Sequence, residues 1–405
     1  MFAGAAIGAS HLVQSTRAGA LFGYGLILFV ILSNFFKYPF FQYGQRYTAV
    51  TGESIIDGYA HLGKWAVLLF YVINHFTATI STAGVTFVTA ALSSFFVELL
   101  FGYSIDLTLM SAIILVSILG ILFIGKYSLL DKLVKIFIVM LSITTVFAYF
   151  YADGVDLFSS MNIPTDLFDI SSPTFFFLVA LMGWMPAPIE ASTWASVWML
   201  ARQKETGYKP ELKTTLMDFN VGYIGTSVLA LFFLGLGAKI MYNSGQEFST
   251  SAIGFVKQLI SLYTDTFGEW SLVLIIMITL ATMASTTLTV VDAYPRTLEN
   301  ALGNLMPKLK DKSEKVYWFY LFFMSSVALI IIHLFRTDFK SMIDFATTIA
   351  FLGGPIFAIL NYLLVKSKRM PKETRPSGFL NYLSIGGIIF LSGFALLFII
   401  AKAIN

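Results

Sequence analysis

The stretch PTFFFLVALMGWMPAPIEASTWASVWML, residues 173–200, decides the fold. It is long and apolar enough to cross a bilayer, which takes about 20 residues in a helix. Gly183, Pro186 and Pro188 lie in its centre, and Glu190 follows them. Proline removes a backbone donor and clashes with the preceding turn, so we expect the helix to break in mid-membrane. Broken backbone is tolerated at that depth only where it is buried in protein or lines a cavity. The sequence therefore predicts a cavity at this break.

The composition is that of a protein that crosses the membrane many times. Of the 405 residues, 57% are hydrophobic and only 12% are charged, whereas soluble domains carry roughly 25% charged residues. The chain has no cysteine, which excludes disulfides and thiolate metal sites. No basic stripe supports binding to nucleic acid, and residues 1–10 lack the basic leader of a cleavable signal peptide. We expect a multi-pass protein of the cytoplasmic (inner) membrane.

Hydropathy predicts an all-α protein with eleven transmembrane helices in a single domain, residues 1–405. The expected spans are roughly 2–20, 22–43, 63–97, 107–124, 132–152, 173–200, 216–241, 269–294, 316–335, 343–365 and 379–402. The span at 63–97 is expected to end in an extramembrane turn near Glu98. An amphipathic segment at 251–263 is expected to lie on the membrane surface.

The loop charges predict the orientation, because cytoplasmic loops carry an excess of lysine and arginine. The loop from Tyr151 to Pro173 contains four aspartates and no basic residue. The loops expected on the opposite side carry the basic residues Lys126, Lys132, Lys135, Arg202, Lys204, Lys209, Lys213, Lys308, Lys310, Lys312, Lys315, Lys366, Lys368, Arg369, Lys372 and Arg375. With eleven spans, this pattern places the N-terminus in the cytoplasm and the C-terminus outside.

A second interruption is expected in the first span, where Gly8-Ala9-Ser10-His11 stands at membrane depth. Interrupted segments at matching positions in two halves indicate an inverted-repeat secondary transporter whose substrate site lies where the breaks meet. We expect repeat one at about 1–152, repeat two at about 173–365 and an extra helix at about 379–402. Half-helix ends would supply partial charges to the site, positive at N-termini and negative at C-termini.

Several short motifs, in the same order along the chain, resemble the NRAMP (natural resistance-associated macrophage protein) family of divalent-metal transporters. They are Arg17-Ala18-Gly19-Ala20 with Phe22-Gly23-Tyr24, Gln45-Arg46-Tyr47 with Thr51-Gly52-Glu53, Gly125-Lys126-Tyr127 before Leu130-Asp131-Lys132, Met185-Pro186, and Ser285-Thr286-Thr287-Leu288-Thr289. The resemblance covers nearly the whole chain and implies the leucine-transporter fold, with ten helices in two inverted five-helix repeats and one more.

The departures from the family fall on its metal and proton sites. The family's Asp-Pro-Gly-Asn at the first break corresponds to Gly8–His11, so Gly8 replaces the metal-binding aspartate. The histidine after Met-Pro is replaced by Ala187, and the metal-facing glutamine of span 10 falls near Gly353. The acidic pair that carries protons in span 3 of the family falls near Ile80 and Ala83. The resemblance thus implies the fold but a divergent member without the usual metal ligands.

These departures favour a small organic solute over a metal. Divalent ions need hard oxygen or imidazole ligands with negative charge, and no carboxylate stands at the first break. Two glycines in place of aspartate and glutamine are also expected to widen the cavity. A neutral amino acid would fit, its carboxylate at a half-helix N-terminus. The expected substrate-binding residues are Gly8, Ala9, Ser10, His11, Met182, Met185 and Gly353. No metal ligands are assigned; if a metal is carried instead, His11 and Met185 are the candidates.

Protons are the expected coupling ions, with sodium as the alternative and no cofactor. Glu190 is the first candidate carrier, because an ionisable group inside the membrane is by default functional and burial favours the neutral form of a carboxylate. His11 and His75 are further candidates, and a hydrogen-bonding role is the alternative for each of the three. Trp184, beside the break, is a candidate gate. The hydroxyls of span 8 are expected either to pack helices or to contact substrate.

The sequence as a whole predicts a secondary transporter that works by alternating access, with spans 1, 2, 6 and 7 rocking against spans 3, 4, 8 and 9. No pair of carboxylates and no nucleophile with a base nearby suggests an enzyme. Two other functions stay open: divalent-metal transport through a rearranged site, and a non-transporting membrane sensor. The expected partners are a small-molecule or ion substrate and the lipid bilayer, and we expect a monomer.

Overall fold

The computed structural model describes residues 6–124, 128–244 and 248–404. Its helices run α2 Thr16–Phe22, α3 Ile27–Thr51, α4 Ile55–Leu62, α5 Lys64–Phe101, α6 Leu107–Ile124, α7 Ser128–Tyr151, α8 Pro173–Gly183, α9 Ala191–Thr206, α10 Leu212–Met241, α11 Ala252–Phe267, α12 Leu272–Leu305, α13 Ser313–Leu334, α14 Phe339–Lys366 and α15 Gly378–Ile404. A π-helix, η1, covers Ser10–Ser15 and runs into α2. Short 3₁₀ turns cover Glu269–Ser271, Pro307–Lys312 and Lys372–Thr374.

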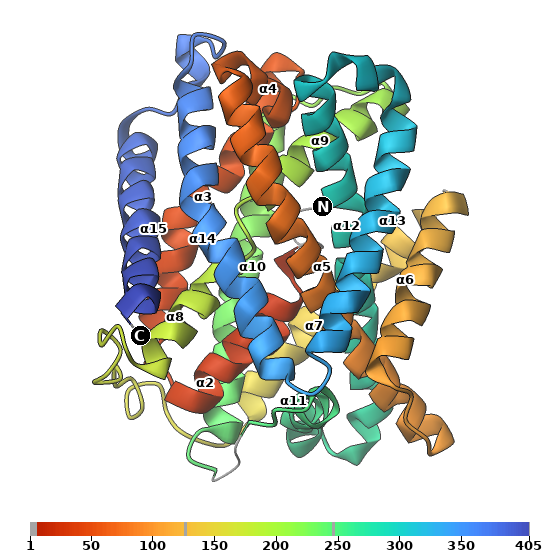
Figure 1. Ribbon diagram of the computed structural model, residues 1–405. Coiled ribbons are helices and arrows are strands. Elements are labelled where there is room, and N and C mark those ends of the chain that lie inside the picture. Colours follow the sequence, from red (N-terminus) through yellow and green to blue (C-terminus); the bar gives the residue numbers. More distant parts are fainter. Residues whose placement is uncertain (1–5, 125–127, 245–247, 405) are drawn as a thin grey trace.

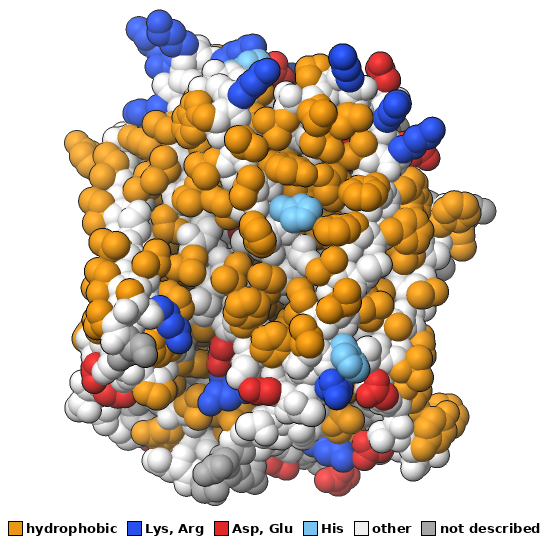
Figure 2. All heavy atoms as spheres, in the orientation of Figure 1, with side chains coloured by type: hydrophobic (Ala, Val, Ile, Leu, Met, Phe, Trp, Pro, Cys, Tyr) orange, Lys and Arg blue, Asp and Glu red, His pale blue; other side chains and the backbone are white. Residues whose placement is uncertain are grey.

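Seven helices in the described ranges are long and apolar enough to cross a membrane: α5, α6, α10, α12, α13, α14 and α15. They correspond to seven of the expected spans. Two others are interrupted. The first has a bend at residues 7–8, before η1 and α2, and the other is divided between α8 and α9. The helix α3 is long, but its buried face carries Ser33, Asn34, Lys37 and Gln42. Figure 2 shows a broad hydrophobic surface between two ends where charged side chains gather.

The helix ends follow local sequence signals. Pro173 occupies the first turn of α8, where its missing N–H costs nothing, and the Ser172 hydroxyl accepts a hydrogen bond from the Phe175 amide. The segment expected at the membrane surface forms the helix α11, whose N-cap is Ser251. The third span was expected to end at residue 97, before a turn near Glu98, but α5 continues for four more residues and ends at Phe101. It ends there because Gly102 adopts a left-handed conformation (φ 76°), which favours glycine.

The core is built around the long helices α5 and α12, which pack against each other. The divided helices pack on other long helices: α2 packs on α10, α8 packs on α14, and α9 packs on α3. In Figure 1, α4 lies at the upper end of the bundle and α11 at the lower end, and we call these the α4 end and the α11 end. The helix α15 lies at one edge, against α3 and α14, and α6 lies at the opposite edge.

Candidate functional site

The second break separates α8 from α9 by seven residues, Trp184 to Glu190. Pro186 and Pro188 cannot donate the backbone hydrogen bonds that a continuous helix would need at these positions. The chain turns instead through the Trp184 and Met185 amides, which both donate to the Met182 carbonyl. The expected mid-membrane interruption is therefore confirmed, and it leaves the last carbonyls of α8 without helical partners.

The first break takes a different form from the second. The backbone bends at Ile7 and Gly8, and the chain then continues as the π-helix η1 rather than as an unwound loop. The Thr286 side chain of α12 fills the space beside Gly8, since a Cβ added there would lie 2.8 Å from both Thr286 Cγ2 and Oγ1. The same hydroxyl donates a 3.0 Å hydrogen bond to the Ile7 carbonyl. Thr286 thus satisfies a backbone group that the bend exposes.

The two breaks touch each other although they lie 176 residues apart in the chain. The Ser10 hydroxyl lies 3.2 Å from the Pro186 carbonyl oxygen and 3.0 Å from the Ala6 carbonyl oxygen. Both carbonyls belong to interrupted backbone, where the helical donors are missing. One serine side chain therefore contacts both interrupted segments, and its single proton can be donated to only one acceptor at a time.

A small cavity lies between the two breaks. Its walls come from both breaks and from α5, α9 and α12, and they are lined by Ala6, Gly8, Ala9, Ser10, Ser81, Val85, Trp184, Pro186, Ala187, Pro188, Trp194, Thr286, Val290 and Tyr294. The volume of about 30 Å³ is enough for one or two water molecules. We expected the glycines to widen this space. It is narrow in this conformation because Thr286 and Trp184 occupy it.

Several polar atoms around this cavity have no hydrogen-bond partner. They are the indole nitrogens of Trp184 and Trp194, the Ser81 hydroxyl and Glu190 Oε2, and all four side chains are buried. An unsatisfied buried donor costs about 1–3 kcal/mol, so such a group is expected to meet water or a ligand. Two of these atoms are indole N–H groups, which can only donate. Trp184 and Trp194 both line the cavity, so two unpartnered donors belong to its lining residues.

Four of the residues expected at the site line the cavity: Gly8, Ala9, Ser10 and Trp184. His11 is turned toward α10, where its Nε2 donates to the Thr226 carbonyl at 2.9 Å. Its Nδ1 lies 2.8 Å from the Ser10 hydroxyl. Both ring nitrogens are thus engaged in hydrogen bonds, one of them to the interior of α10 rather than to an end of the interrupted helix.

Three other expected residues contribute to the surroundings of the cavity rather than to its lining. Met182 contributes its backbone carbonyl to the end of α8. The Met185 sulfur lies 4.0 Å from the Ser15 hydroxyl, and Gly353 faces Ile73 and Thr77 of α5. These side chains are not brought together around one point.

His75 lies on α5 among aromatic rings, with ring centroids 6.0 Å from Tyr71 and Tyr320 and 5.5 Å from Phe323. Its Nδ1 is buried without a hydrogen-bond partner. Asp292 and Arg296 form the structural ion pair that their spacing suggests, at 2.8 Å. The segment Gly125–Tyr127, which carries part of the family resemblance, lies outside the described residues.

Glu190 is fully buried at the N-cap position of α9, in contact with α12. Its Oε1 accepts a 3.2 Å hydrogen bond from the Tyr294 hydroxyl, while Oε2 has no partner. A carboxylate with one unfilled oxygen is costly to bury when charged. The geometry suits a group that can take up and release a proton.

Residues that the sequence reasoning did not select complete the cavity. Ser81, Trp194 and Tyr294 line it from three different helices, and none of them belongs to a recognisable local motif. Arg17 and Asp344 did carry a signal, because each is a charged residue within an expected span. Lys37 carried the same signal and was also overlooked.

The α11 end of the bundle is closed by an ion pair between α2 and α14. Arg17 donates to both carboxylate oxygens of Asp344, at 2.7 and 3.1 Å. Gln14 joins the pair, accepting from Arg17 at 3.0 Å and donating to Asp344 at 3.2 Å and to Thr347 at 3.1 Å. Arg17 is 2% exposed and Asp344 28% exposed. The pair thus connects the first divided helix to α14 at the border of the buried core.

Asp344→Asn is expected to open this end more often. The amide cannot form the bidentate charged pair, and a loss of about 1.4 kcal/mol would raise the open population about tenfold. Because the chain has no cysteine, a cysteine placed at Ser81 in the cavity reports opening through its rate of labelling by a thiol reagent. Asp338→Asn is the matched control, since Asp338 caps the same helix at Ser341 without touching α2. Equal labelling rates in the Asp344 variant and the parent would contradict the assignment.

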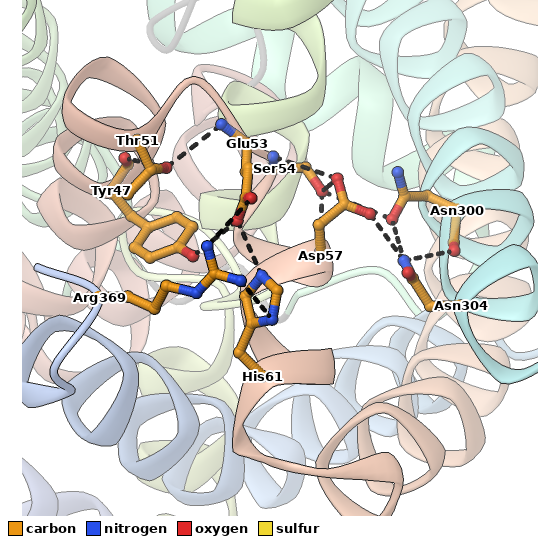
Figure 3. A network of polar contacts seen from close by, with 9 residues as sticks. All are labelled: Tyr47, Thr51, Glu53, Ser54, Asp57, His61, Asn300, Asn304 and Arg369. Atoms are coloured by element: carbon orange, nitrogen blue, oxygen red, sulfur yellow. Dashed lines mark hydrogen bonds and ion pairs between the residues drawn. The ribbon is translucent and has the colours of Figure 1, made fainter.

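The α4 end is closed by a larger polar network, shown in Figure 3. Glu53 accepts from His61 at 2.9 Å and from Tyr47 at 3.2 Å, and it pairs with Arg369 at 3.6 Å. Asp57 accepts from Asn304 of α12 at 2.7 Å. The network therefore joins the α3–α4 turn to α12 and to the segment after α14.

The second divided helix is attached to this same end. The Ser196 hydroxyl of α9 lies 2.6 Å from the Thr48 hydroxyl of α3 and accepts from the Ile55 amide at 2.8 Å. Trp198 of α9 donates to Asp292 of α12 at 3.3 Å. Polar contacts therefore link the divided helices to the rest of the bundle at both of its ends.

Comparisons with known proteins agree with this architecture. A family model described as natural resistance-associated macrophage protein-like matches residues 1–401. The chain is 37% identical over 406 residues to an uncharacterized protein of Pasteurella multocida (strain Pm70), with 100% of this chain and 91% of that protein covered.

Solved structures show the same fold at low identity. A mutant of the Eremococcus coleocola manganese transporter superposes with a TM-score of 0.65 at 13% identity, covering 98% of this chain and 84% of that one. MhsT in complex with L-phenylalanine gives 0.64 at 12% identity, covering 99% and 96%. Mhp1, a nucleobase-cation-symport-1 family transporter, gives 0.64 at 13% identity, covering 99% and 87%. The family match, together with this shared fold, points to a transporter rather than an enzyme. The chain belongs to the natural resistance-associated macrophage protein-like family, and it is a multi-pass membrane transporter with the all-helical leucine-transporter fold.

Proposed function

We propose that this transporter carries a small organic solute with a carboxylate group, such as a neutral amino acid, by alternating access. The observation that carries the proposal is the pair of unpartnered indole N–H groups, Trp184 Nε1 and Trp194 Nε1, beside the cavity between the breaks. Indole N–H groups can only donate, so they match the acceptor oxygens of a carboxylate. A metal ion is a cation and cannot accept a hydrogen bond from an indole N–H group.

The walls of the cavity are a poor cage for a divalent ion. Its described lining residues include no aspartate, glutamate or histidine, and hard divalent ions require such oxygen or nitrogen ligands. Elsewhere in the described ranges, no three His, Cys, Asp or Glu side chains are grouped to hold a metal. An organic carboxylate avoids this difficulty, because it brings the negative charge with it.

The solute would enter in a different conformation from the one described. A volume of about 30 Å³ is smaller than an amino acid, so Trp184 has to move when one end opens. A Cβ at Gly84 would lie 2.9 Å from the ring of Trp184, which shows how closely this side chain is held. The contacts at the two ends would break alternately. In this motion η1–α2, α3, α8–α9 and α10, which are spans 1, 2, 6 and 7, would rock against the other helices.

A proton is the proposed coupling ion, with Glu190 as its carrier and sodium as the alternative. Glu190 is the buried carboxylate nearest the second break, and its free Oε2 can accept a proton. The protein is proposed to act as a monomer in the cytoplasmic membrane. Its α4 end would face the cytoplasm, because lysine and arginine side chains gather there in Figure 2.

Trp184→Phe and Trp194→Phe are the test of the substrate class. Each change removes one N–H but keeps an aromatic ring, so each is expected to weaken binding about tenfold, or about 1.4 kcal/mol. A thermal-shift screen of neutral amino acids and small organic acids would first identify a ligand that stabilises the purified protein. Its dissociation constant is then compared between the variants and the parent.

Trp198→Phe is the matched control, because that indole donates to Asp292 and does not line the cavity. The methyl ester of the ligand should bind equally weakly to parent and variants, since it has lost the carboxylate charge. Equal affinity for acid and ester would contradict the proposal.

Divalent-metal transport is the second candidate, favoured by the family and by the manganese transporter among the structural neighbours. It predicts saturable Mn²⁺ binding by calorimetry that is lost in His11→Ala and Met185→Ala. A shift in melting temperature with metals alone would replace the organic solute by a metal. Uptake into proteoliposomes would exclude a sensor that does not transport.

A further inference from the structure

A lysine of α3 reaches the end of α8 inside the bundle. Lys37 is 1% exposed, and its Nζ donates to the carbonyl oxygens of Met182, Gly183 (2.9 Å) and Ala187 (3.4 Å). Carbonyl oxygens only accept, so three such contacts require three N–H groups. Only the charged ammonium form has them. The three contacts favour this form, which places a positive charge at the second break.

The carbonyls that surround this ammonium form a cation site. Those of Met182 and Gly183 are the last groups of α8, and that of Ala187 belongs to the interrupted segment after it. The C-terminus of a helix carries a partial negative charge. The Ser33 hydroxyl, one helical turn before Lys37 on α3, approaches the same group of carbonyls, at 3.0 Å from Met185 O and 3.4 Å from Met182 O. Neutral oxygens at the end of a broken membrane helix are the ligands that transporters use for sodium.

We propose that Lys37 is a tethered cation, which permanently fills a sodium-type site at the end of α8. The transporter then needs no free cation to hold the second break in shape, and it rejects metal ions there by charge repulsion. This inference does not depend on the identity of the substrate. It also gives a reason why protons, rather than sodium, would be coupled to transport.

Removal of the ammonium should create a sodium site where the parent has none. Lys37→Met keeps the length of the side chain and removes its charge. We expect the melting temperature of purified Lys37→Met to rise saturably with NaCl relative to choline chloride at equal ionic strength. Radioactive sodium should bind to this variant with a stoichiometry of one, while the parent shows neither effect. Lys37→Arg keeps a cation in place and should behave like the parent.

Lys239→Met is the matched control for the loss of a lysine. Lys239 also donates to a backbone carbonyl, that of Ala152 at 2.8 Å, but it lies on α10 away from the second break. This variant should not respond to sodium. Lys37→Gln is a second neutral variant in case Lys37→Met folds poorly, and purification in high sodium should rescue either one.

Three results would overturn the proposal. The first is saturable sodium binding by the parent, since its site should already be full. The second is a folded neutral variant that ignores sodium. The third is failure of both neutral variants to fold even in high sodium, because sodium would then not replace the ammonium. None of these measurements requires transport, so the outcome is separate from that of the proposed function.

Discussion

Replacing Glu190 by glutamine is expected to abolish proton-driven accumulation of the substrate while leaving exchange of substrate across the membrane in place. Glutamine resembles the protonated carboxyl in size and can still accept the hydrogen bond from Tyr294, which the parent forms at 3.2 Å. It cannot release a proton. The variant should therefore bind and carry substrate in both directions but should not use a pH gradient.

The physical reason lies in the cost of the charged state. Glu190 is fully buried, and its Oε2 has no hydrogen-bond partner in the described structure. Burying a carboxylate whose second oxygen has no hydrogen-bond partner is costly. We therefore expect the carboxyl to be neutral when the site is closed and charged when one end opens to water. In proteoliposomes with an imposed pH gradient, accumulation by the parent should exceed that by Glu190→Gln about tenfold or more, which corresponds to a coupling of at least about 1.4 kcal/mol.

Glu98→Gln is the matched control, because Glu98 forms a surface pair with Lys257 at 2.9 Å, far along α5 from the breaks. It should accumulate substrate like the parent. If Glu190→Gln kept its response to the pH gradient, proton transfer would have to be assigned elsewhere, first to His75. If it also lost exchange, Glu190 would be a structural residue of α9.

The second break could be predicted from sequence because its cause is local. Two prolines within three residues prevent a helix whatever surrounds them, and α8 does end at Gly183. The amphipathic helix α11 and the basic loops are local signals of the same kind. The collinear motifs likewise identified the family, because their order along the chain is a property of the sequence itself.

The geometry of the first break could not be predicted, because distant residues decide it. Gly8 permits a bend but does not specify the π-helix that follows, and His11 is turned away from the cavity by the Thr226 carbonyl of α10. The space left by a small residue was assumed to stay open. It is filled by Thr286, whose hydroxyl finds a partner in the Ile7 carbonyl.

The charged residues inside the spans have partners that become visible only when several spans are considered together. Arg17 and Asp344 are 327 residues apart, and each looks unpaired when its own span is considered. Lys37 has backbone carbonyls as partners, which no side-chain pattern can indicate. Intramembrane charges are functional candidates by default, and this rule marks all three residues in the sequence.

Gly237→Ala is expected to destabilise the protein strongly, because α10 and α2 are in backbone contact at this position. The added Cβ would lie 2.2 Å from the Thr16 carbonyl oxygen and 3.2 Å from the Ala20 nitrogen, both on α2. The contact is reciprocal, since a Cβ at Gly19 of α2 would lie 1.8 Å from the Leu234 carbonyl oxygen of α10. Backbone cannot yield as a side chain can, so the two helices would have to separate. Overpacking costs about 1–3 kcal/mol, and we expect the upper end of that range here.

The same helix provides the control. Gly225 of α10 has no atom within 4 Å of an added Cβ, so Gly225→Ala should be neutral or stabilising by about 0.5–1 kcal/mol through helix propensity alone. Melting temperatures of the two variants in one detergent give the comparison, with Gly237→Ala several degrees lower or unable to yield monodisperse protein. Because α2 carries the Arg17 end of the ion pair with Asp344, its displacement should also speed labelling of a cysteine at Ser81. A Gly237→Ala variant as stable as Gly225→Ala would mean that α2 and α10 do not pack this closely.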